Sequence, residues 1–252
     1  MPTDRADLTL RPATGEDADA LAEMFVAARE AAYPAMPRTV HTPQECRHWF
    51  REVLGLEPRT IPMPATRETW VAERGGDLVG YAVVDPAWLD SLYVRPDLTG
   101  SGIGSALLDL VKGLRPDGFA LWVFETNTRA QDFYRRHGLV VVRRTDGSDN
   151  DERAPDLEMA WLGTDPVATL RRRIDDVDDR LAALLAERAA LTAVVQRLKE
   201  VPGHPGRDPD REAEIVDRMA RLAARQGGPL SRDHLARIMH VVISESLDAA
   251  DE

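Results

Sequence analysis

The chain has 252 residues, of which 43% are hydrophobic and 30% charged, and a formal net charge of -11. This composition excludes a disordered, collagenous or rod-like chain, and the length favours two compact domains. The acidic balance argues against nucleic acid or an anionic membrane as partner, but it leaves room for a small anionic substrate where basic groups gather.

Cysteine content and hydropathy bear on the compartment. Cys46 is the single cysteine, so neither an intrachain disulfide nor a cysteine-based metal cluster is expected. The N-terminal residues are polar, and no apolar run approaches the ~18 residues needed to span a bilayer. The sequence therefore predicts a cytoplasmic protein without a leader, a membrane anchor or a metal ion.

The first part of the chain alternates strand-like and helix-like segments. Period-two patterns and short apolar runs predict strands at 8–11, 70–73, 78–84, 89–94 and 120–124, and a further strand near 157–161. Helices are expected at 17–31, 43–54, 105–114 and 128–137. This order indicates a mixed α/β domain.

The texture changes near Gly163, because every Trp, Phe and Tyr lies before it and the remainder is rich in Leu, Ala and Arg. An apolar stripe from Leu170 to Leu198 predicts a helix of about 33 residues, far longer than the ~11–12 residues of an average globular helix. Such a helix packs against a partner chain or spans a bundle. Pro- and Gly-rich breaks then separate two further helices, so we expect domains at 1–163 and 164–252.

A glycine-rich segment follows the expected strand at 89–94. Gly100, Gly102 and Gly104 allow close approach of the backbone to a ligand and direct successive N–H groups into one concavity at a helix N-terminus. The spacing predicts a turn that fits a pyrophosphate. A tight strand-to-helix turn that binds nothing is the alternative.

A second motif begins about 25 residues later and reads Asn127, Ala130, Phe133-Tyr134 and Gly138. Together the two motifs resemble the GNAT superfamily of acetyl-CoA-dependent N-acyltransferases, over residues 8 to 162. The resemblance implies an α+β mixed-sheet domain that uses acetyl-CoA as co-substrate. The implied cofactor-binding residues are Leu92, Val94, Gly100, Gly102, Ile103, Gly104, Ser105, Asn127 and Tyr134.

Tyr134 would also protonate the departing CoA thiolate, since a phenol with a pKa of about 10 is protonated at neutral pH. A core tyrosine on an amphipathic helix is the alternative. Thr99 departs from the family's usual Gln or Arg, and Trp122 stands where some members carry a general-base Glu. The base is open between Glu125, Asp90 and a water molecule. The acidic domain favours a cationic or amine-bearing small molecule or peptide as acceptor.

Three cations interrupt the apolar texture of the long helix. Arg188 and Lys199 are 11 positions apart, which at 100° per residue returns them to one face. Arg171 precedes Arg188 by 17 positions, roughly 25 Å along the axis, so it reaches an equivalent pocket only in an antiparallel partner. The alternative is that all three face solvent on a surface helix.

The string from Leu170 to Arg188, followed by Lys199 and by 207–212, resembles the all-helical type II chorismate mutase family over 165–249. The resemblance implies a homodimer of intertwined three-helix chains that converts chorismate to prephenate without cofactor or metal. Arg188, Lys199 and Glu212 would be catalytic: Arg188 with the partner subunit's Arg171 on the carboxylates, Lys199 on the ether oxygen and Glu212 on the ring hydroxyl. The implied substrate-binding residues are Arg171, Arg188, Lys199, Asp208, Arg211, Glu212 and Ser246.

One departure concerns the third helix, where Ser246 is followed one turn later by Ala250 instead of the family's Gln or Glu. The leading hypothesis is a bifunctional N-acetyltransferase and chorismate mutase. Alternatives are an acetyltransferase whose helical domain serves dimerisation or chorismate sensing, a mutase-family lyase acting on isochorismate, and a degenerate GNAT fold that regulates the mutase. If the activities share a pathway, an amine-bearing product of chorismate metabolism is the expected acceptor.

Overall fold

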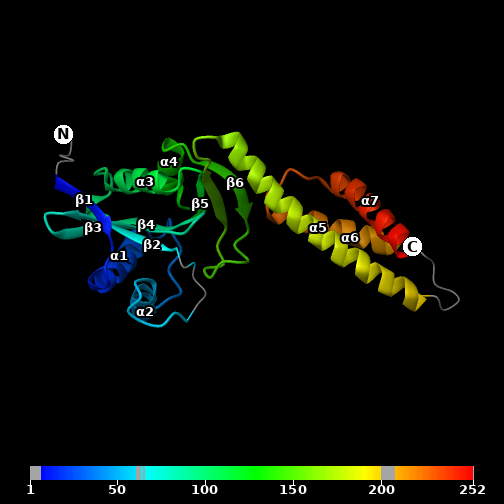
Figure 1. The fold of residues 1–252 in the computed structure, drawn as a ribbon, viewed down its shortest axis with the longest axis horizontal. Helices are drawn as coiled ribbons and strands as arrows, with labels where there is room; N and C mark the ends of the chain where they lie inside the picture. Colours follow the sequence, from blue (N-terminus) through cyan, green and yellow to red (C-terminus); the bar gives the residue numbers. More distant parts are fainter. Residues whose placement is uncertain (1–6, 61–63, 65, 200–207, 252) are drawn as a thin grey trace. The chain divides into compact units, whose positions relative to one another are not determined.

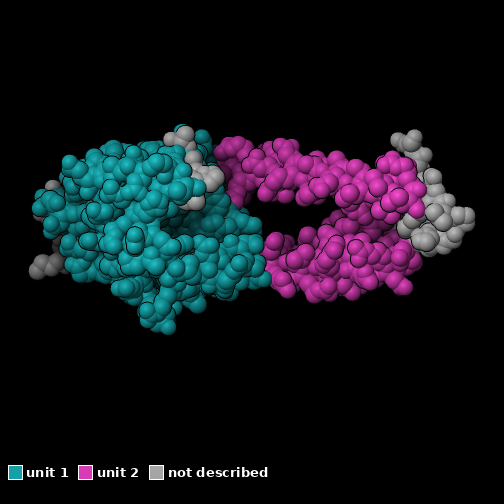
Figure 2. Space-filling view, turned by 90° about the horizontal axis from the view of Figure 1, so that it is seen from below, with its two compact units in different colours: residues 1–166 teal, residues 167–252 magenta. Residues whose placement is uncertain are grey.

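The computed structural model describes residues 7–60, 64, 66–199 and 208–251. The chain divides into two compact units, Met1–Pro166 and Val167–Glu252, coloured teal and magenta in Figure 2. Within the described ranges, no helix is long and apolar enough to cross a membrane.

The first unit follows the expected order of elements with one addition (Figure 1). Its strands are β1 (Leu8–Pro12), β2 (Glu68–Arg74), β3 (Asp77–Val84), β4 (Leu89–Val94), β5 (Phe119–Phe124), β6 (Val140–Thr145) and β7 (Asp156–Trp161). Its α-helices are α1 (Ala18–Ala31), α2 (Pro43–Val53), α3 (Ile103–Leu114) and α4 (Thr128–Arg136). Short 3-10 turns at Gly15–Asp17 and Pro96–Leu98 lead into α1 and the glycine loop.

Strand β6 was not predicted from the sequence, and it corrects the expected topology. It pairs antiparallel with β7, with Val140 opposite Ala160. The signal was present, because three consecutive valines follow Gly138, whose φ of 81° turns the chain after α4. A β-branched run bounded by a turn glycine is typical of a strand.

The strands form two antiparallel sheets, ordered β1-β2-β3-β4 and β5-β7-β6. Strands β4 and β5 run parallel and meet only at their first residues, where Trp88 bridges Ala120 and the Ala120 N–H donates to the Ala87 carbonyl at 2.9 Å. Beyond this bridge β4 pairs with β3 alone among the described strands. One edge of β4 is therefore left for a ligand.

Helices cover both faces of the first sheet because successive strand residues point to opposite sides. Tyr81 and Val83 join the core under α1 and α2, whereas Ala82 and Val84 join the core under α3 and α4. Figure 1 shows α3 and α4 on one side of the strands and α1 and α2 on the other. Two separate apolar cores thus fix β4 between two helical layers.

The second unit consists of α5 (Pro166–Lys199), α6 (Pro209–Arg225) and α7 (Arg232–Asp251). The expected fold class, an α+β mixed-sheet domain followed by an all-α three-helix domain, is confirmed. Helices α6 and α7 share a small core of Val216, Met239 and Ile243. By contrast, α5 leaves its apolar stripe open, and its most exposed members are Leu184 (62%), Leu191 (61%) and Leu198 (73%).

Candidate functional sites

The glycine loop connects β4 to α3, as the motif predicts. Gly100 and Gly102 have φ values of 88° and 89°, in the left-handed region that favours glycine. A Cβ added to either one would meet no atom within 4 Å, so both are required by the backbone conformation and face open space. The glycines therefore set the backbone conformation of the loop, and no side chain occupies the space beside Gly100 and Gly102.

The backbone N–H groups of this loop point to an anion. Those of Gly102, Ile103 and Gly104 find no hydrogen-bond acceptor among the described residues. They stand at the N-terminus of α3, where the helix dipole adds partial positive charge. The Thr99 hydroxyl donates to the Pro96 carbonyl, so Thr99 does not add a free side-chain donor to these backbone groups.

Ser105 lies in the first turn of α3, and its hydroxyl is 3.0 Å from Nε2 of His137. Burial, and next the nearby charge of Lys112, lower the pKa of His137. A neutral imidazole therefore orients the Ser105 hydroxyl at the edge of the loop. Sequence reasoning missed His137, which follows α4 and is 32 positions away in the chain.

The residues expected along the CoA arm lie on β4 and α4. Leu92 and Val94 are partly buried on the edge strand. Asn127 is the N-cap of α4, where its side-chain oxygen accepts from the Ala130 N–H at 3.2 Å. Burial raises the pKa of Tyr134 well above its usual value, so the phenol, 9% exposed, keeps its proton. Asn127 thus has a structural task beside the one predicted for it.

A cavity of about 830 Å³ opens on the α1–α2 side of β4, and it was not predicted from the sequence. Its described lining is made of Phe25, His41, Thr42, Gln44, Glu45, Cys46, His48, Trp49, Phe50, Glu52, Thr60, Asp90 and Ser91. Asp90 belongs to β4 and stands two residues before Leu92, about 7 Å along a strand. The cavity therefore reaches the strand expected to hold the CoA arm.

The carboxylates considered as general base have different surroundings. Asp90 lines the cavity, and burial raises its pKa although Arg67 opposes the shift. Glu125 is exposed and pairs with Arg144 at 2.9 Å. Trp122 stacks on Trp88 with ring centroids 5.9 Å apart. Of the two carboxylates, only Asp90 lines the cavity.

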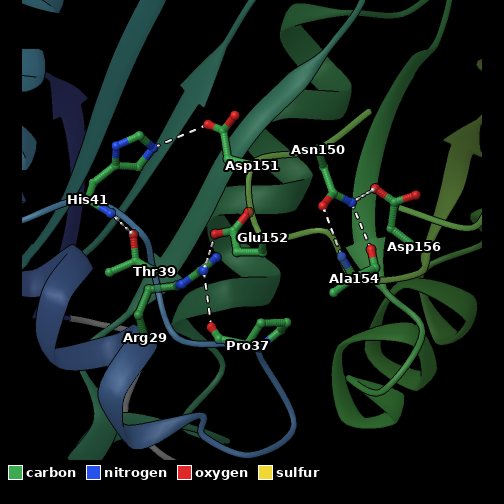
Figure 3. Close-up of polar contacts among 9 residues, drawn as sticks. All are labelled: Arg29, Pro37, Thr39, His41, Asn150, Asp151, Glu152, Ala154 and Asp156. Carbon is green, nitrogen blue, oxygen red and sulfur yellow. Dashed lines mark hydrogen bonds and ion pairs between the residues drawn. The ribbon is translucent and has the colours of Figure 1, made fainter. Parts of the chain in front are cut away.

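The rim of the cavity is tied to the loop between β6 and β7 (Figure 3). Arg29 of α1, only 7% exposed, forms an ion pair with Glu152 and donates to the Pro37 carbonyl at 3.1 Å. Nε2 of His41, which lines the cavity, lies 3.3 Å from Asp151. These contacts tie the segment that contains Pro37 and His41 to the loop that contains Asp151 and Glu152.

In the helical unit, α5 brings Arg188 to α7. Its guanidinium donates to the Ser246 hydroxyl at 2.6 Å and to the Val242 carbonyl at 3.2 Å. Ser246 is 6% exposed and also bonds the Val242 carbonyl. The structure thus joins two of the predicted substrate-binding residues.

The other predicted residues of this unit are not all brought together. Glu212 lines a cavity of about 200 Å³ between α6 and α7. Asp208 caps α6 by accepting from the Arg211 N–H at 3.0 Å, and the Arg211 side chain pairs with Glu214 at the surface. Arg171 is exposed near the start of α5.

Two further positions singled out in the sequence lie near helix ends. Lys199 ends α5, and its side chain lies outside the described residues. Helix α7 continues through Ala250, so this position stands one helical turn after Ser246, as the spacing implied. Within the described ranges, no group of three or more His, Cys, Asp or Glu side chains is arranged to hold a metal ion.

Comparison with known proteins relates each unit to a family. A model of the GNAT acetyltransferase domain matches residues 65–140, and a model of type II chorismate mutase matches residues 170–250. The peptidyl-lysine N-acetyltransferase YjaB of Escherichia coli (strain K12) is 30% identical over 95 residues, 37% of this chain and 64% of the relative. The bifunctional chorismate mutase/prephenate dehydratase of the same organism is 33% identical over 82 residues, 32% of this chain and 21% of the relative.

The solution structure of apo-form YjaB from Escherichia coli aligns with a TM-score of 0.49 at 23% identity, covering 62% of this chain and 99% of that chain. The chain spans less than two thirds of the length of each of the two curated relatives. The matched segments contain the glycine loop with β4 in one case and the Arg188–Ser246 contact in the other. Residues 65–140 therefore match the GNAT acetyltransferase domain, and residues 170–250 match type II chorismate mutase.

Proposed function

We propose that the chain is a bifunctional enzyme that transfers an acetyl group from acetyl-CoA to an amine in residues 1–163 and converts chorismate to prephenate in residues 164–252. The observation that carries the first activity is the set of unpartnered N–H groups at Gly102, Ile103 and Gly104, next to the open edge of β4. Backbone donors at a helix N-terminus suit the CoA pyrophosphate, and an open strand edge suits an amide-bearing arm.

In the acetyl transfer, the chain's task is to align a neutral amine with the thioester carbonyl. The N–C bond forms, a backbone N–H near Val94 stabilises the oxyanion, and the C–S bond then breaks. Asp90 takes the amine proton, and Tyr134 gives its proton to the departing thiolate. The surroundings of both groups support these roles, because Asp90, at the partly exposed mouth of the cavity, has a raised pKa and accepts a proton more readily, and the buried Tyr134 stays protonated.

In the rearrangement of chorismate, restraint and electrostatics replace acid–base chemistry. Arg188 would hold one carboxylate, and Glu212 and Lys199 would face the hydroxyl and the ether oxygen. Arg171 lies 17 residues before Arg188 on one continuous helix, about 25 Å away, which favours a site completed by the partner subunit's Arg171. The exposed apolar stripe of α5 supports the homodimer that such a site needs.

A second candidate function treats the helical unit as a chorismate-sensing or dimerisation module. Ala250 favours it, because a methyl group cannot donate to the ether oxygen on which negative charge grows. A lyase acting on isochorismate remains the other reading of the same position. Both predict that the unit binds the dicarboxylate while prephenate does not form.

Assays on the purified full chain test the two activities separately. We expect prephenate to appear from chorismate, and acetyl-CoA to bind with one site per chain by calorimetry. Chorismate binding without prephenate formation would favour the sensing module or the lyase, which product analysis with isochorismate separates. Absence of acetyl-CoA binding would overturn the acetyltransferase assignment.

A further inference from the structure

The large cavity beside β4 combines aromatic walls with acidic and other polar side chains. Phe25, Trp49 and Phe50 contribute aromatic surface, and the rings of Trp49 and Phe50 meet edge to face with centroids 4.8 Å apart. Its volume of about 830 Å³ lies in the range of ~300–1,000 Å³ that is typical of small-molecule sites. The space therefore suits an apolar body of the size of a substituted ring.

Three carboxylates line the cavity, together with the imidazoles of His41 and His48. Asp90, Glu45 and Glu52 belong to the described lining, and neither Lys nor Arg does. Glu45 accepts from the Thr42 N–H at 2.7 Å and Glu52 from the Thr60 N–H at 2.9 Å, so both serve the local fold. Asp90 accepts only side-chain contacts and is the acid left to meet a ligand.

The nearest cation to Asp90 is engaged elsewhere. Arg67 donates to both carboxylate oxygens of Asp85, at 2.7 and 2.6 Å, and reaches Asp90 at 3.4 Å. The Ser91 hydroxyl donates to Asp90 at 3.0 Å. Asp90 can therefore accept a hydrogen bond from an ammonium or amine group, while the carboxylates of the lining disfavour a ligand that brings a further negative charge into the cavity.

We propose that this cavity binds the acceptor substrate, and that the acceptor is a primary amine on an aromatic body with no carboxylate next to the amine. The ring would lie against Phe25, Trp49 and Phe50, and the amine would meet Asp90. This inference rests on the proposed acetyltransferase function. It disfavours aromatic amino acids and amino-substituted chorismate relatives as acceptors, because each carries a carboxylate.

Three probes that share one ring separate charge from size. We expect 2-phenylethylamine to be acetylated with a kcat/KM about 100-fold above that of L-phenylalanine, measured by free-thiol release from acetyl-CoA, since unpaired like charges in a buried site disfavour binding strongly. L-phenylalaninamide has the bulk without the charge and should recover most of the difference. Equal rates for the amine and the amino acid, or an amide as poor as the acid, would overturn the proposal.

Variants locate the amine within the cavity. Asp90→Asn keeps the shape of the side chain and should raise KM for 2-phenylethylamine at least tenfold while the dissociation constant for acetyl-CoA stays unchanged. Asp77→Asn, at an exposed acid of β3, is the matched control and should change neither value. An unchanged KM in Asp90→Asn would remove Asp90 from the acceptor site.

The result also distinguishes this proposal from the activity on which it rests. Acetyl-CoA binding by calorimetry reports the first domain independently of any acceptor. Should acetyl-CoA bind and a lysine-containing peptide be acetylated while 2-phenylethylamine is not, the acceptor class proposed here is wrong and the acetyltransferase stands. Should acetyl-CoA fail to bind, the domain-level function falls first.

Discussion

The two units of the chain differ in how completely each one buries its own apolar surface. The α/β unit encloses two cores around its first sheet, and residues such as Leu21, Leu107 and Met159 are fully buried. The described helical unit has a small core of Val216, Met239 and Ile243 between α6 and α7 and exposes the stripe of α5. The first unit therefore buries most of its apolar surface within itself, whereas α5 of the second unit leaves an apolar stripe exposed, as the proposed homodimer requires.

The largest effect is expected from a charged residue placed in the exposed apolar stripe of α5. Leu191→Asp should abolish dimerisation and prephenate formation, because each buried leucine contributes about 1.5–3 kcal/mol and a dimer contains two. Light scattering after size exclusion and the chorismate assay measure both effects. Arg180→Asp, where the native guanidinium bonds its own helix, is the control. A wild-type monomer with full mutase activity would refute the contrast.

Arg188→Ala addresses the site within the helical unit. Loss of a charged contact to a buried carboxylate costs about 2–5 kcal/mol, so prephenate formation should fall at least about 30-fold. Acetyl-CoA binding should be unchanged, because the Arg188 guanidinium donates its hydrogen bonds to Val242 and Ser246 of α7, within the helical unit. A mutase rate within threefold of wild type would show that the predicted carboxylate contact is wrong.

Glu152→Gln tests whether the α/β unit is held together internally. It leaves the buried guanidinium of Arg29 without its charged partner, which should lower the free energy of unfolding of this unit by about 3 kcal/mol. Glu125→Gln breaks an exposed pair with Arg144 and should cost less than about 1 kcal/mol. Calorimetric unfolding compares the two variants, and similar losses would argue against a special role for Arg29 at the rim.

Gly102→Ala tests whether the left-handed backbone conformation of the glycine loop is needed to bind acetyl-CoA. The left-handed conformation disfavours any Cβ by about 1–2 kcal/mol, so acetyl-CoA should bind about tenfold more weakly. Gly113→Ala lies in the same helix, where an added Cβ meets no atom within 4 Å, and should stabilise by about 0.5–1 kcal/mol. Equal affinity in both variants would mean that the loop does not position the ligand.

The smallest expected effect is a pH dependence confined to the α/β unit. Hydrogen bonds from Arg11 and then from Thr14 lower the pKa of Asp17 from 3.8 to about 2. The resulting stability, about 1–2 kcal/mol, is present above pH 4 and is lost as the pH falls through 2. Asp17→Asn should flatten this slope in acid unfolding, whereas Asp19→Asn, an exposed neighbour, should not.

Local patterns predicted most of the elements because they are written in short stretches of sequence. Strand β4, the glycine loop and α3 follow from an apolar run, three glycines and an amphipathic helix. Strand β6 was not predicted, although its valines are typical of a strand, because the apolar run is short and directly follows the motif that ends at Gly138.

The site was predictable only where its donors are backbone groups or sequence neighbours. The loop at 98–105 and the residues Arg188 and Ser246 were predicted from the sequence. The structure places the Arg188 guanidinium 2.6 Å from the Ser246 hydroxyl. The cavity was not expected, because Phe25, Trp49 and Asp90 come from α1, α2 and β4. No spacing rule relates residues on three elements that only the packed cores bring together.

By itself the sequence determined the two-domain organisation, the two families and the loops whose glycines set the backbone. The tertiary structure alone decided that Asp90 lines the cavity beside β4, that Glu125 pairs with Arg144, and that Arg29 pairs with Glu152. The physical reason is the separation along the chain over which each effect acts. Propensity and periodicity act over a few neighbouring residues, whereas burial, charge pairing and cavity walls depend on contacts between residues up to 123 positions apart in the chain.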